Sequence, residues 1–157
     1  MPDISSLLDA ATPRELAVRV CLDGAAAARE AELQAELDQL GPWQPSSLGE
    51  TNPGAVLAEQ IAAVRAEVDA ATVEFRFRAL GHLAFSDLLA NHPPASGSRD
   101  LYAETFLPVL LAACCVSPTL SAGQVRQLLQ KVNHGTATCL FDAALAVNEE
   151  PSPLPFS

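Results

Sequence analysis

The 157-residue sequence is poor in several residue types, and each shortage narrows what the chain can do. Lys131 is the only lysine, which leaves little for Schiff-base or phosphate-binding chemistry. Aromatic residues make up 5%, and the apolar 49% is mostly alanine and leucine, which favour helix over strand. The net charge of −10 repels phosphate backbones and anionic lipid surfaces. We therefore expect a helix-rich domain that binds neither nucleic acid nor membranes.

Long apolar runs and targeting patterns are missing as well. The longest run, Phe106 to Val116, contains Pro108 and falls short of the roughly 18 residues that cross a bilayer, so it predicts a buried helix. The first residues lack the pattern of a signal peptide. The cysteines lack a CxxC spacing and predict reduced, buried thiols in a cytoplasmic protein: Cys21, Cys114, Cys115 and Cys139.

Residue patterns that carry catalysis are also absent. His82, His92 and His134 are scattered, and no HExxH, GxSxG, GxxxxGK[ST] or GxGxxG motif occurs. Cys114 lies in an apolar segment, which should raise the pKa of its thiol and make it a poor nucleophile. The sequence therefore predicts no enzyme activity, no cofactor and no metal site.

Two strands flanking a helical hairpin are the clearest feature that is present. Residues 14–22 carry valines two positions apart, and residues 72–79 alternate strictly between apolar and polar side chains, as half-buried strands do. Between them, residues 25–40 and 55–71 repeat leucine, isoleucine and valine at helical spacing, with Gly41-Pro42 ending the first helix. Because a hairpin returns the chain to its start, we expect a two-strand antiparallel ribbon connected by a helical hairpin.

The remainder predicts a four-helix lobe, with helices near 82–91, 103–116, 121–132 and 136–147. Ser121 and Gln124 form the pattern of a capping box at the third of these helices. The fold class is α+β and mostly helical. We expect a flexible N-terminus (1–13), a single domain (14–148, divided into 14–79 and 80–148) and a flexible, proline-rich tail (149–157).

Two groups of residues are candidates for binding a partner protein. The first is the apolar seam of the hairpin, which could either hold a partner helix or only join the two helices: Leu33, Leu37, Leu57, Ile61 and Val64. The second is Arg76 and Arg78 on the polar face of the second strand. These two arginines could bind a partner's carboxylates or simply form a solvated strand face.

Several blocks resemble the small tail assembly chaperone-like proteins of actinobacterial siphophages and prophages. They are FRFRAL (75–80), FSDLLANHPP (85–94), ETFLP to ACCV (104–116) and LFDAALAVN (140–148). This chain departs from the pattern at Phe85, where a tryptophan is expected, and at Thr136-Ala137-Thr138, where another aromatic is expected.

The resemblance implies a function and its partners. Such chaperones coat the long hydrophobic tape-measure protein in the bacterial host cytoplasm and are released as tail-tube protein polymerises. The chain could also form a homo-oligomer. The alternatives are a structural virion component, such as a tail or connector subunit, or another non-enzymatic protein-interaction domain.

Overall fold

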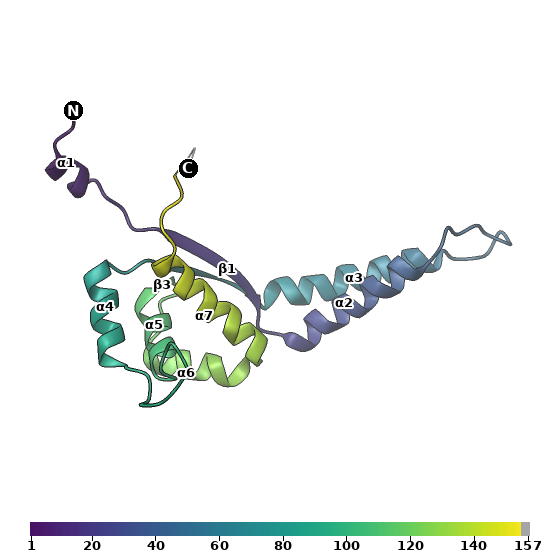
Figure 1. Ribbon diagram of the computed structural model, residues 1–157. Coiled ribbons are helices and arrows are strands. Elements are labelled where there is room, and N and C mark those ends of the chain that lie inside the picture. The colour runs from purple at the N-terminus through teal and green to yellow at the C-terminus, as the bar shows by residue number, and fades with distance from the viewer. Residues whose placement is uncertain (155–157) are drawn as a thin grey trace. The chain divides into compact units, whose positions relative to one another are not determined.

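The computed structural model describes residues 1–154 and divides the chain into two compact units (Figure 1). We call Met1–Val18 with Glu74–Ser157 the lobe unit, and Arg19–Val73 the hairpin unit. Of the described residues, 55% are helical, and they also form an antiparallel sheet, so the predicted α+β, mostly helical class is confirmed. The elements in order are α1 (Ile4–Asp9), β1 (Glu15–Cys21), α2 (Gly24–Gln39), α3 (Pro53–Ala70), β2 (Thr72–Arg78), α4 (His82–Asn91), α5 (Phe106–Cys114), β3 (Cys115–Ser117), α6 (Ala122–Lys131) and α7 (His134–Glu149).

The strands β1 and β2 pair as predicted, with the helical hairpin connecting them. One end of the ribbon is closed by the hydrogen bond that the Ala79 amide donates to the Arg14 carbonyl (2.8 Å). At the other end, the Leu22 amide donates to the Ala71 carbonyl (2.9 Å). These pairings run in opposite directions along the two segments, which is the antiparallel arrangement.

The prediction of only two strands was wrong, because a third strand, β3, pairs with β2. Arg76 lies opposite Ser117 and Phe77 opposite Cys115, with an irregularity between the two pairs. The helix that we expected to reach residue 116 ends at Cys114. A three-residue strand is too short to show a period of two, and the apolar run continues through it, so the change from helix to strand leaves no sequence signal.

The alternation in β2 correctly predicted which of its faces is buried. Phe75 and Phe77 are buried, whereas Glu74, Arg76 and Arg78 are exposed. Phe77 belongs to the same unit as the helices α5, α6 and α7, among which α5 packs on both others. These helices bury Phe106, Leu110, Leu111, Val125, Leu140, Ala144 and Val147.

The two ends of the chain and the first turns of α5 and α6 can also be compared with the predictions. The predicted flexible N-terminus holds the short helix α1, none of whose residues is buried. The capping box at Ser121 and Gln124 is confirmed, and Pro108 lies in the first turn of α5, where its missing amide costs nothing. Residues 150–154 of the expected tail have no regular secondary structure, and residues 155–157 lie outside the described part.

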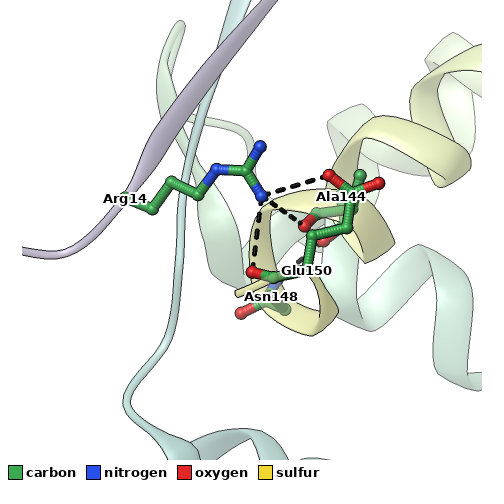
Figure 2. A network of polar contacts seen from close by, with 5 residues as sticks. Arg14, Ala144, Asn148 and Glu150 are labelled. Carbon is green, nitrogen blue, oxygen red and sulfur yellow. Dashed lines mark hydrogen bonds and ion pairs between the residues drawn. The ribbon is translucent and has the colours of Figure 1, made fainter. Parts of the chain in front are cut away.

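Arg14 joins the start of β1 to the end of α7 within the lobe unit (Figure 2). Its guanidinium donates to the carbonyls of Ala146 (3.2 Å) and Glu150 (3.4 Å) and pairs with the Glu150 carboxylate (3.2 Å). Asn148 completes the cluster, because its side chain donates to the Ala144 carbonyl and accepts the Leu80 amide. A cation on the last carbonyls of a helix is also favoured by the helix dipole.

Replacing Arg14 with alanine is expected to lower the free energy of unfolding by about 1–2 kcal/mol, because carbonyls at the end of α7 lose their donor. Urea denaturation monitored by circular dichroism measures this change. Arg14→Lys keeps the charge but not the forked guanidinium donor, so its free energy of unfolding should lie between those of the wild type and Arg14→Ala. Arg99→Ala, at an exposed arginine, is the matched control and should change little. Equal stability of Arg14→Ala and Arg99→Ala would refute a structural role for this contact.

Candidate protein-interaction surfaces

The hairpin seam faces inward between α2 and α3. Ile61 is 4% exposed, and Leu33, Leu37, Leu57 and Val64 are half-buried. The helices run antiparallel, since Arg29 meets Glu67 near one end while Leu37 lies beside Gly54 near the other. All five predicted seam residues are thus buried or half-buried, as expected for side chains that pack between two helices. Whether they also contact a partner stays a prediction.

The two arginines of the hairpin both form ion pairs, near the ends of α2 and α3 that adjoin the strands. Arg29 pairs with Glu67 (2.5 Å) and Arg65 with Glu30 (2.8 Å). Both arginines are exposed, so each pair is worth at most about 1 kcal/mol. These two arginines are the only basic residues in positions 20–75. The far half of the hairpin, residues 32–60, therefore contains five carboxylates and no basic residue: Glu32, Glu36, Asp38, Glu50 and Glu59.

Apolar side chains lie exposed where α2 passes into α3. We call residues 37–56 the hairpin tip. Leu40, Trp43 and Val56 are 42%, 37% and 44% exposed, and Leu48 is fully exposed. From the sequence, residues 43–53 were expected to form a loop between the two helices, and no exposed apolar surface was predicted there. The signal that could have found it is the chain's only tryptophan in a segment with no apolar period to bury it.

Two clefts meet at Trp43. The first, of about 440 Å³, is lined by Leu37, Leu40, Gly41, Pro42, Trp43, Asn52, Pro53 and Gly54. The second, of about 460 Å³, is lined by Trp43, Pro45, Ser46, Ser47, Leu48 and Glu50. Trp43 therefore lines both clefts, which makes it the central residue of the tip.

Local hydrogen bonds order the tip. The Ser46 amide donates to Glu50 Oε2 (2.8 Å), and the Ser46 hydroxyl donates to Glu50 Oε1. These side-chain and backbone hydrogen bonds from Ser46 lower the pKa of the Glu50 carboxyl and favour its charged form. Asn52 caps α3 by accepting the Gly54 amide (2.8 Å).

The two predicted arginines of β2 are paired with carboxylates of the lobe unit. Arg78 lies 2.8 Å from Glu15, and Arg76 lies 2.9 Å from Glu74 and 3.7 Å from Glu15. Both arginines are exposed and form ion pairs with carboxylates of the protein itself. Binding of a partner's carboxylates there would have to displace Glu15 and Glu74.

A third hollow lies on the lobe unit between α5 and α6, with a volume of about 550 Å³. Its lining mixes apolar and charged side chains: His92, Glu104, Thr105, Pro108, Val109, Ala122, Arg126, Leu129 and Gln130. His92 Nδ1 lies 3.2 Å from the Thr105 hydroxyl. Opposite charges on Glu104 and Arg126 give the hollow no clear preference for the sign of a ligand.

Groups with catalytic potential remain dispersed in the described chain. Within residues 1–154, histidines, cysteines and carboxylates form no group of three or more that could hold a metal ion. Burial, then the neighbouring Cys115, raises the pKa of the Cys114 thiol to about 12, as the sequence predicted. The prediction that the thiols are buried was wrong for Cys139, which is exposed on α7, and Cys21 is only half-buried.

The raised pKa of Cys114 should make stability fall at alkaline pH. An unfolded cysteine ionises near pH 8.5, whereas folded Cys114 keeps its proton to about pH 12. Its stabilising contribution is therefore present below pH 8.5 and lost as pH rises toward 12, by up to about 1.4 kcal/mol per pH unit. Urea denaturation at pH 8 and pH 10.5 should show a shallower fall for Cys114→Ala than for the exposed control Cys139→Ala. Parallel falls in the two variants would contradict this origin.

No helix within residues 1–154 combines the length and apolar character needed to cross a membrane.

Comparison with known proteins adds no relative from which a role could be transferred. Neither models of protein families, nor curated proteins, nor solved structures match the chain.

Proposed function

We propose that this protein is a phage tail assembly chaperone. It has no enzymatic activity; it binds the tape-measure protein in the bacterial host cytoplasm and keeps it soluble until tail-tube protein takes its place. The observation that carries the proposal is the exposed apolar hairpin tip. It lies within residues 32–60, the far half of the hairpin, which contains five carboxylates and no basic residue. The blocks that resemble tail assembly chaperone-like proteins give the proposal its specific form.

The charge and exposure of the hairpin suit a protein that protects a hydrophobic partner. Exposed apolar side chains provide the contact, and the surrounding carboxylates keep the complex in solution. Affinity from a small surface of this kind is modest, which suits a partner that must later be released.

The resembling blocks lie on elements of the lobe unit, of which β2, α5, β3 and α7 carry buried residues and α4 carries none. They include the second half of β2, most of α4, the α5–β3 segment and the second half of α7. They contribute core residues such as Phe77, Phe106 and Leu140. The resemblance therefore supports a shared lobe, while the hairpin tip supports the partner-binding role independently of it.

Co-expression with the tape-measure protein encoded by the same phage or prophage tests the proposal. The tape-measure protein should be insoluble alone and recovered as a soluble complex when this chain is present. An unrelated acidic helical protein at equal expression is the control for a general solubilising effect. A monodisperse chain that leaves the tape-measure protein in the pellet would sink the proposal.

A structural virion component is the second candidate, and the position of β1 favours it. In the order β1-β2-β3, strand β1 lies at the sheet edge and could add a strand from another copy, giving a homo-oligomer. Mass spectrometry of purified particles separates the two roles. A chaperone is absent from the particle, whereas a structural subunit is present in fixed stoichiometry.

A further inference from the structure

We infer that the hairpin tip is a docking site for an amphipathic helix of the partner, one that presents an apolar face flanked by lysine or arginine. Trp43 is the central contact. The identity of the partner rests on the proposed function, but the chemistry of the helix follows from the tip itself.

The apolar part of the site is concentrated around one aromatic ring. Leu40, Trp43, Leu48 and Val56 are all exposed within seventeen residues, and the two clefts share Trp43. Tryptophan is enriched among the residues that dominate binding energy at interfaces. Ser46 and Asn52, which both follow Trp43 in the chain, hold the backbone between the tryptophan and α3 through hydrogen bonds.

The charge of the site selects a basic partner. Five carboxylates and no basic residue lie in residues 32–60, and Arg29 and Arg65 are already paired with Glu67 and Glu30. The α2 C-terminus adds partial negative charge with no basic residue in its last turn, while Asn52 caps the positive end of α3. The same charge repels nucleic acid and anionic membranes.

The secondary structure of the tip favours a helix over an extended peptide. Residues 37–56 contain no strand, so an extended segment would find no edge to pair with. Two clefts of about 440 and 460 Å³ that share Trp43 as a lining residue can accept two neighbouring side chains from one face of a helix. The described tip therefore fits the helix-in-groove mode of recognition.

The fluorescence of Trp43, the chain's only tryptophan, reports on the site directly. An 18-residue leucine-lysine amphipathic peptide should shift the emission to the blue in a saturable manner. The same peptide with glutamate in place of lysine should bind at least tenfold more weakly. Added salt should weaken the lysine peptide, because part of the attraction is between exposed charges.

Substitutions test whether the lysine peptide binds at the hairpin tip. By calorimetry, Trp43→Ala and Leu40→Ser should each weaken the lysine peptide tenfold or more, and Asp38→Asn several-fold. Leu83→Ser, at an exposed leucine of α4, is the matched control and should bind like the wild type. Equal binding by Trp43→Ala, preference for the glutamate peptide, or a blue shift caused by self-association without peptide would each overturn the inference.

Co-expression of the same variants separates this inference from the proposed function. If the wild type solubilises the tape-measure protein and Trp43→Ala does not, both stand. If both proteins solubilise it, the function stands and the tip is overturned as its site. If neither does while the lysine peptide still requires Trp43, the docking site stands and the tail-chaperone role fails.

Discussion

Replacing Phe106 with alanine is expected to lower the free energy of unfolding of the lobe unit by about 3–5 kcal/mol. Phe106 is 0% exposed and begins α5, the helix that packs against both α6 and α7. Its ring stacks on that of Tyr102, with 5.3 Å between the ring centroids, and forms a T-shaped pair with Phe85 at a centroid distance of 5.9 Å. The alanine variant therefore loses buried area and two aromatic contacts, and it leaves a cavity beside a helix that cannot shift without disturbing its neighbours.

Urea denaturation with far-ultraviolet circular dichroism measures the loss. Phe106→Leu fills part of the space and should cost clearly less than the alanine variant. Leu101→Ala, at a largely exposed position nearby in sequence, is the control and should cost little. A Phe106→Ala variant as stable as Leu101→Ala would mean that the ring is not part of the core.

The sequence predicted the elements whose pattern is long and regular. The alternation in residues 72–79 located β2 and its buried face because a strand with one wet side must alternate. The repeats of Leu33, Leu37, Leu57 and Ile61 located the hairpin because each helix needs a continuous apolar stripe. Local capping chemistry at Ser121 fixed the start of α6.

The elements that escaped prediction are short or depend on distant partners. β3 is three residues long and exists because the edge of β2 accepts it, which no local pattern encodes. The helix α1 is six residues long and has no side-chain cap at its start, so no local sequence pattern marks it. The exposure of Trp43 depends on how α2 and α3 end, so the sequence showed the residue but not its role as part of a candidate site.

The role of the hairpin seam can be decided by placing a charge in it. Ile61 is the most deeply buried of the five seam residues. Ile61→Asp removes apolar contact and buries a carboxylate without a partner, which should cost the hairpin unit roughly 3–5 kcal/mol. The unit has little other core, because only Val20, Ala26 and Ile61 are buried among residues 19–73. The two helices should therefore separate in this variant.

Hydrogen exchange measured by mass spectrometry follows this opening along the chain. In Ile61→Asp, the amides of α2 and α3 should lose protection, while those of α5 and α7 keep it because they belong to the other compact unit. Ala63→Asp puts the same charge on an exposed position of the same helix and should leave protection intact. Unchanged protection in Ile61→Asp would mean that the seam is not what joins the helices. Its leucines would then be available to a partner, and the tip would lose its place as the main contact surface.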